Sequence, residues 1–70
     1  MAQLPVWRTV TVGVDGRYYT GSYAVQDEML HVHFKDLKKV TQIGGSDVLA
    51  LARLLLRELI AESQNRPPVE

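Results

Sequence analysis

Two histidines separated by one residue, His31 and His33, are the side chains in this sequence with the clearest potential for chemistry. Alternate residues of a strand lie on the same face, so a strand at this place would present both imidazoles together. Neutral imidazole binds zinc, copper or nickel, but a structural zinc site needs four ligands and a catalytic one three. The chain has no cysteine, and the predicted sheet face offers no carboxylate beside the pair. We therefore interpret both histidines as partly solvated, and we predict no metal site and no cofactor.

Hydroxyl groups share the predicted face of these histidines, and the nearest of them belongs to Ser22. Nucleophilic catalysis needs a base within hydrogen-bond reach and a third group that orients the base. Ser22 would neighbour His33 if a two-residue turn joins their strands, but no acid is placed to orient that histidine. Asp27 and Glu28 are adjacent carboxylates in a turn, whereas acid–base catalysis uses carboxylates held in distinct environments. We therefore predict no catalytic residues and a protein that is not an enzyme.

The segment Gly44–Gly45–Ser46 precedes the strongest helix pattern of the chain. Free N–H groups at a helix start can bind an anion, but the segment lacks the lysine and the spacing of a P-loop. A helix start is the better interpretation. Ser46 has a side chain suited to capping the first free N–H groups, and Asp47 places negative charge at the positive end of the helix dipole.

The predicted helix, Val48–Ile60, has one broad apolar face at a helical period of about 100° per residue. This face consists of Val48, Leu49, Ala52, Leu55, Leu56, Leu59 and Ile60. It must be buried, because each large aliphatic side chain removed from water contributes about 1.5–3 kcal/mol. Leu54 falls on the opposite side and Leu51 at its edge. The pattern leaves open whether these two leucines are simply exposed or form a second contact surface.

The first half of the chain predicts an antiparallel sheet. A strand is predicted over 6–14, where residues 9–14 alternate valine with threonine or glycine, and Asp15–Gly16 then gives a strong signal for a hairpin with a two-residue turn. The return strand covers 17–25 and is rich in tyrosine and threonine. The face predicted to lie under the helix carries Val6, Val10, Val12, Val14, Tyr19, Tyr23 and Val25. The uncovered face carries Trp7, Thr9, Thr11, Tyr18, Thr20 and Ser22.

A third strand is predicted at Met29–Phe34, after a polar turn of two or four residues. Either turn length places Leu30, Val32 and Phe34 on the covered face. Another turn is expected at Lys35–Lys38, and a short fourth strand at Lys39–Ile43. The predicted fold is therefore α+β, an antiparallel three- to four-stranded meander with one face covered by a single C-terminal helix. We expect a flexible start over 1–5, one domain over 6–62 and a flexible tail over 63–70.

Length and charge exclude several classes of function. Seventy residues with no cysteine form one small domain that buries a modest share of its surface, and such domains often gain stability by association. The net charge is zero, so there is no general attraction to phosphate backbones or to anionic membranes. No apolar run is long enough to span a bilayer, and the first residues lack the pattern of a signal peptide. We therefore expect a soluble cytoplasmic protein without a membrane partner.

Two resemblances add to these predictions. Residues 42–46, followed by the leucine-rich 51–59, resemble small bacterial proteins of unknown function; this resemblance covers the last third of the chain and implies no activity. A three-stranded sheet backed by one helix is also similar in architecture to plant-type and integrase-type DNA-binding domains, which carry several arginines on the sheet. Here Arg8 and Arg17 fall on the covered face, so the uncovered face is expected to have no fixed positive charge.

The sequence therefore predicts a non-enzymatic protein-interaction or regulatory module that self-associates, with a homodimer as the expected assembly. Another protein is the second possible partner, and the alternative function is a nucleic-acid-binding module that uses the uncovered sheet face. The predicted interaction surface consists of Trp7, Tyr18, Thr20, His31, His33, Leu51 and Leu54.

Overall fold

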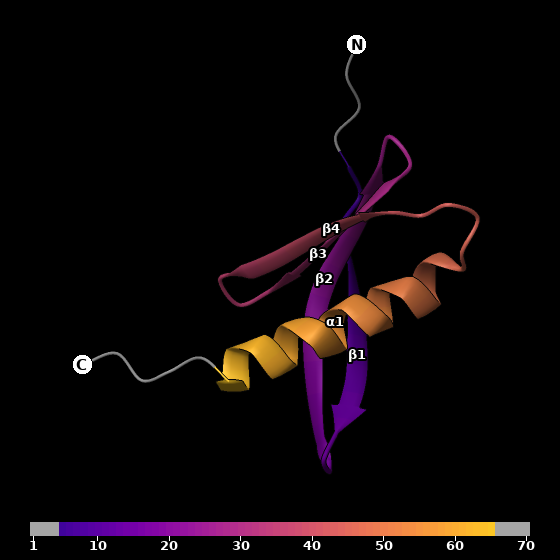
Figure 1. The fold of residues 1–70 in the computed structure, drawn as a ribbon. Helices are drawn as coiled ribbons and strands as arrows, with labels where there is room; N and C mark the ends of the chain where they lie inside the picture. Colours follow the sequence, from indigo (N-terminus) through magenta and orange to yellow (C-terminus); the bar gives the residue numbers. More distant parts are fainter. Residues whose placement is uncertain (1–4, 66–70) are drawn as a thin grey trace.

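The structure, a computed structural model, describes residues 5–65 as a four-stranded antiparallel sheet followed by one helix (Figure 1). The elements in chain order are β1 (Arg8–Val14), β2 (Arg17–Gln26), β3 (Met29–Phe34), β4 (Leu37–Gln42) and α1 (Val48–Asn65). Consecutive strands are neighbours, in the order β1-β2-β3-β4, so the sheet is an open meander. The predicted α+β fold is confirmed, and the fourth strand is present.

The first hairpin has the geometry that its sequence predicts. Asp15 and Gly16 both have positive φ, 52° and 79°, as a type I′ turn requires. Pairing starts with Val14 opposite Arg17 and continues without a bulge to the start of β1, in the predicted register. The two faces of the hairpin are therefore the predicted ones.

The second and third hairpins also close through two-residue turns. Asp27 and Glu28 have φ of 55° and 61°, which strains residues with a side chain because Cβ approaches the following carbonyl oxygen. The predicted turn over 35–38 is wrong, because Leu37 already pairs with Phe34 and its aliphatic side chain packs against the core. As a consequence, β4 begins at Leu37 rather than at Lys39.

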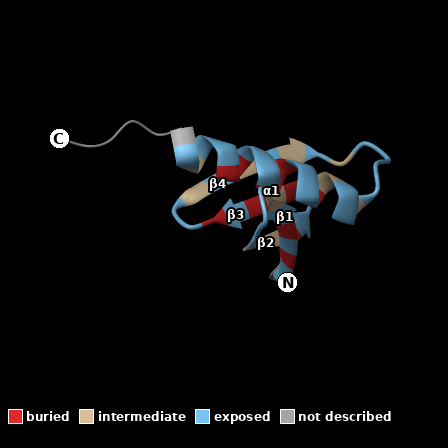
Figure 2. Cartoon of the chain, turned by 90° about the horizontal axis from the view of Figure 1, so that it is seen from below, coloured by how far each residue is buried: buried red, intermediate tan, exposed pale blue. Residues whose placement is uncertain are grey.

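The core lies between α1 and one face of the sheet (Figure 2). Leu30 and Val32 of β3 and Leu56 of α1 have no exposed surface. The other buried members of this cluster are Val10, Val12, Phe34, Ala52, Leu55, Leu59 and Ile60. The predicted helix face and the predicted sheet face therefore meet.

Gly21 of β2 allows α1 to approach the sheet closely. A Cβ atom on this residue would lie 2.8 Å from Leu56 Cδ1 and 2.8 Å from the carbonyl oxygen of His33. Non-bonded carbon atoms prefer a separation of about 3.5–4.0 Å, so any side chain here would have to push the helix or the strand away. The missing side chain at Gly21 thus sets the spacing between the two layers at this point.

Three residues predicted on the covered faces are exposed: Val6 by 68%, Val25 by 42% and Leu49 by 38%. Val6 precedes β1. Val25 lies near the end of β2, which extends beyond α1 (Figure 1). Leu49 lies in the first turn of α1, and this turn extends past β1 in both Figure 1 and Figure 2. The helix therefore covers less of the sheet than the alternation of side chains predicts. Likewise, the sheet covers less of the helix than the apolar periodicity of the helix predicts.

The helix starts at Val48, as predicted, but it is capped by a different side chain. The backbone N–H of Leu49 donates to Asp47 Oδ1 at 3.2 Å, so Asp47 is the cap and the prediction of Ser46 is wrong. Gly44 and Gly45 have positive φ and form a tight turn, in which the Ser46 N–H donates to the Ile43 carbonyl oxygen. This turn occupies Ser46 and leaves the capping position to Asp47.

The helix ends at Asn65, beyond the Ile60 limit that its apolar periodicity predicts. Its last residues, 61–65, are mostly polar and continue the helix past the apolar stripe. The segments predicted as flexible were 1–5 and 63–70. Residues 1–4 and 66–70 of these segments lie outside the residues that the structure describes.

Candidate interaction surfaces

The sheet face away from α1 is the first of two uncovered surfaces in residues 5–65, and we call it the open face. The register of the strands assigns its side chains. They are Thr9 and Thr11 of β1, Tyr18, Thr20, Ser22, Ala24 and Gln26 of β2, Met29, His31 and His33 of β3, and Lys38, Val40 and Gln42 of β4. Trp7, just before β1, joins them through its contact with His33.

The indole of Trp7 lies against the imidazole of His33, with ring centroids 4.5 Å apart and an interplanar angle of 46°. Trp7 is still 44% exposed, so one side of the ring pair remains in solvent. Ala24, on the same face, is nearly fully buried, and its cross-strand partner is His31. The open face is thus partly shielded around Ala24 and exposed at Trp7.

Tyr18 is the most exposed large apolar side chain of the described residues, at 84%. Its ring lies over Gly13, with Tyr18 Cε1 3.5 Å from the position that a Cβ of Gly13 would take. Next to this pair, the hydroxyl oxygens of Thr11 and Thr20 are 2.9 Å apart and share a hydrogen bond. An aromatic ring therefore projects from a hydroxyl-bearing sheet near the first turn.

His31 and His33 lie on one face of β3 as predicted, and His33 pairs with Ser22 as the two-residue turn requires. His31 is half-buried and His33 is exposed. Within residues 5–65 no three side chains of the metal-binding types come close enough together to hold a metal ion. The prediction that these histidines act through surface contacts, rather than through a metal, therefore stays a prediction.

The open face carries a fixed positive charge that the sequence did not lead us to expect. Lys38 pairs with His33 and Val40 pairs with His31, so both side chains lie on this face. The cause is the shorter third turn, which starts β4 at Leu37 and thereby sets its register. Val40 is 48% exposed and extends the apolar character of the open face to the last strand.

The second uncovered surface is the outer side of α1. Leu54 is 52% exposed there, flanked by the exposed Ala50 and Arg57. Leu51 is only partly exposed and, like Ile43 and Val48, packs against the core. Of the two leucines predicted for this surface, Leu54 is the one that projects into solvent.

An ion-pair cluster joins β4 to α1 at the edge of the core. Lys39 Nζ lies 2.7 Å from Glu62 Oε2 and 3.4 Å from Glu58 Oε1. The hydrogen bond to Glu62 is the largest influence and raises the pKa of Lys39 above its ordinary 10.5; partial burial opposes the rise, and Glu58 adds to it. These side chains are about one-third to one-half exposed, so the cluster orients the helix rather than forming a reactive site.

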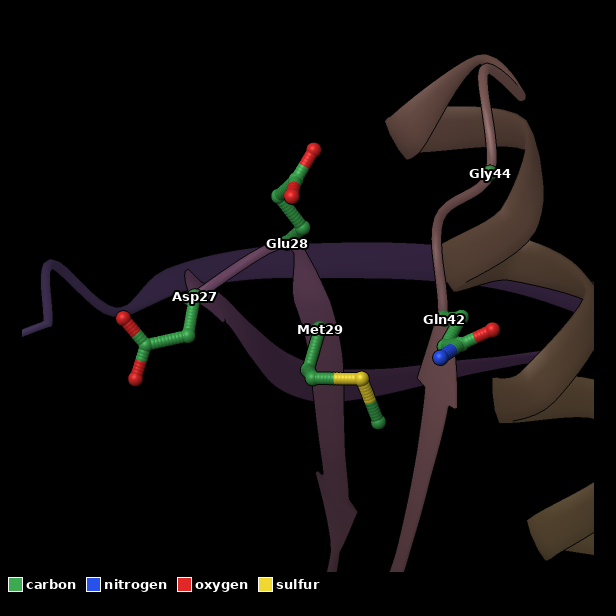
Figure 3. A pocket seen from close by; sticks show the side chains of 5 residues that line it. All are labelled: Asp27, Glu28, Met29, Gln42 and Gly44. Carbon is green, nitrogen blue, oxygen red and sulfur yellow. The ribbon is translucent and has the colours of Figure 1, made fainter.

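A shallow hollow of about 270 Å³ lies between the β2–β3 turn and the loop before α1 (Figure 3). Its walls are Asp27, Glu28, Met29, Gln42 and Gly44. Figure 3 shows that the two carboxylates point in different directions. The nearby backbone is fixed by a hydrogen bond from the Ile43 N–H to the Glu28 carbonyl oxygen, at 3.1 Å. This arrangement does not bring two acidic groups onto one bound molecule.

Comparison with protein-family models, with curated proteins and with solved structures gives no match for this chain. Among the described residues, no helix is both long enough and apolar enough to cross a membrane. The surfaces above are therefore the basis for assigning a function.

Proposed function

We propose that this protein is a non-enzymatic protein-interaction module that self-associates. The observation that carries the proposal is the open face, where Trp7, Tyr18 and Val40 leave 44%, 84% and 48% of their surface exposed on one side of a thin domain. Aromatic residues are enriched, and charged ones depleted, at the centres of protein interfaces. Lys38 is the one fully charged side chain that the register assigns to this face in residues 5–65.

Size supports the same proposal. A chain of 70 residues without cysteine has neither a disulfide nor a large core to stabilise it. Within residues 5–65 a single helix lies on one side of the sheet, so these residues leave the open face without a second layer, and we propose that another molecule supplies it. A closed two-fold dimer is the commonest arrangement of identical chains. The outer side of α1 around Leu54 is the competing route to such a dimer.

Tryptophan fluorescence distinguishes the two routes, because Trp7 is the one tryptophan of the sequence and lies on the open face. If association buries this face, the Trp7 emission shifts to shorter wavelength as the protein concentration rises. Tyr18→Glu should then abolish the shift, whereas Leu54→Glu should leave it unchanged. The reverse result, with dissociation by Leu54→Glu alone, would assign the interface to α1. Circular dichroism of both variants checks that the monomer remains folded.

Nucleic-acid binding is the second candidate, favoured by one observation. The exposed ring pair of Trp7 and His33 lies beside Lys38, so a base could stack on the indole near a positive charge. Phosphate contacts weaken steeply with salt, so titration of mixed-sequence single-stranded DNA at low and high salt, read by Trp7 quenching, tests it. Saturable, salt-sensitive quenching would favour this candidate over protein interaction.

A further inference from the structure

We propose that the free edge of β1 is a docking site for one extended strand of a partner protein, covered by the first turn of α1. This inference concerns a different surface from the open face and goes beyond the function proposed above. It rests on the backbone groups of β1, on the exposed side chain of Leu49 and on the extension of α1 past β1 (Figures 1 and 2).

The outer edge of β1 has backbone groups available for pairing. Within residues 5–65, β1 pairs with β2 alone and is therefore an edge strand. Val14 and Arg17 flank a two-residue turn, so they form a hydrogen-bonded pair. Because hydrogen-bonding direction alternates along an antiparallel strand, the N–H and C=O groups of Thr9, Thr11 and Gly13 point away from β2. All three residues are exposed.

After Arg8 at its start, the edge of β1 lacks the features that normally protect an edge strand from pairing. Charged side chains, proline and bulges block such edges, yet the segment 9–14 has no charge and no proline, and its register is continuous. The opposite edge, β4, carries two adjacent lysines, Lys38 and Lys39. The two edges of the sheet therefore differ, and only β1 is open to another strand.

Leu49 supplies the cover for a strand docked on this edge. It precedes Ala52, Leu56 and Ile60 by three, seven and eleven residues, so it belongs to the helix side that faces the sheet. Those three residues are at most 1% exposed, whereas Leu49 is 38% exposed. The first turn of α1 extends past β1 (Figures 1 and 2). A strand added beside β1 would lie beneath this turn and cover Leu49.

The same overhang identifies the occupant as a single extended strand rather than a second copy of the domain. Antiparallel pairing of β1 with β1 of another copy would place both helices on the same side of a continuous sheet. Because each helix extends past its own β1, the two helices would meet over the junction. A partner strand without its own helix avoids this conflict. Its side chains should alternate, with β-branched apolar residues facing Leu49 and small polar residues facing the open side.

A synthetic peptide with the sequence of residues 8–14 is a suitable probe, because it has this alternation and lacks the helix. Titration into the intact protein, followed by NMR, should show saturable binding. Amide signals of Thr9, Thr11 and Gly13 should shift, and their exchange with solvent should slow. A peptide methylated on the backbone nitrogens that face β1 should not bind, because it cannot donate the required hydrogen bonds.

Two pairs of protein variants locate the bound peptide. Thr11→Pro removes an outward N–H from β1, and Val40→Pro removes the equivalent outward group from β4; only the first should abolish binding. Leu49→Asp should raise the Kd by about tenfold, because the bound peptide loses its apolar contact with the Leu49 side chain. Leu54→Asp, on the outer side of α1, should not change the Kd. Leu49→Asp also keeps the test valid if Thr11→Pro fails to fold.

Several results would overturn the inference. One is the absence of saturable binding by the unmethylated peptide, and another is a loss of affinity from Leu54→Asp equal to that from Leu49→Asp. If the β1 variants instead dissociate the protein's own dimer, the occupant is a second copy and the assignment of a partner strand is wrong. A dimer that persists while the peptide fails to bind would refute this inference and leave the proposed function standing.

Discussion

Replacing Gly21 with alanine should destabilise the domain because it forces the two layers apart. The added Cβ would lie 2.8 Å from a backbone carbonyl oxygen of β3 and 2.8 Å from Leu56 Cδ1. The Leu56 side chain has no exposed surface, so it has no solvent-filled space to move into. Inserting a methyl group into a well-packed core costs about 1–3 kcal/mol. A 70-residue domain has a total stability of roughly 4–10 kcal/mol, so this loss is readily measured.

Urea unfolding followed by circular dichroism is the assay, with Gly13→Ala as the matched control. A Cβ on Gly13 would meet the Tyr18 ring at 3.5 Å, an ordinary contact, so the control should change the free energy of unfolding by less than about 0.5 kcal/mol. In a double-mutant cycle, Leu56→Val should cost less in the Gly21→Ala background than alone, since it relieves one of the two contacts. Equal stability of Gly21→Ala and the wild type would refute the close approach of α1 to β2.

Three further predictions concern the ends and turns of the elements. Asp47→Ala should lower the free energy of unfolding by about 1 kcal/mol through loss of the helix cap, while Ser46→Ala should change it little, as urea unfolding of both variants would show. Glu28→Gly should stabilise the protein by about 0.5 kcal/mol, because glycine relieves the strain of φ 61° at the cost of some chain entropy; no increase in the urea midpoint would contradict this. Lys39 has a pKa raised above 10.5 by Glu62, so its contribution to stability should be complete below pH 10.5 and lost as the pH rises through the higher, folded-state pKa. Thermal unfolding of the wild type and of Lys39→Met should therefore differ below pH 10.5 and converge above the folded-state pKa.

Local sequence rules predict the hairpins well, because the alternation of side chains between the two faces of a strand restricts the possible registers. Once Asp15–Gly16 is a two-residue turn, every pair of β1 and β2 follows, and the alternation of valines decides which face is buried. The position of β4 was harder, because Lys35–Asp36 carries no glycine or asparagine to mark a tight turn. The placement of Lys38 on the open face depends on that turn, because a turn over 35–38 would keep Lys38 out of the strand, whereas Val40 lies on the open face with either turn length.

Local sequence patterns also do not show which part of the apolar side of α1 the sheet buries. Periodicity shows which side of a helix is apolar, but it does not show where that side leaves the sheet. Leu49 has the correct spacing for burial and is nevertheless 38% exposed, because the helix extends past β1 (Figure 1). The exposure of Leu49 results from this crossing, which depends on how the whole helix packs and not on any short segment.

Sedimentation equilibrium of the wild-type protein, from low to high micromolar concentration, tests the central claim of self-association most directly. The monomer mass is 7.9 kDa. We predict that the average mass rises with concentration toward twice this value and that one monomer–dimer equilibrium fits all the data. A mass that stays at 7.9 kDa across the whole range would contradict the claim.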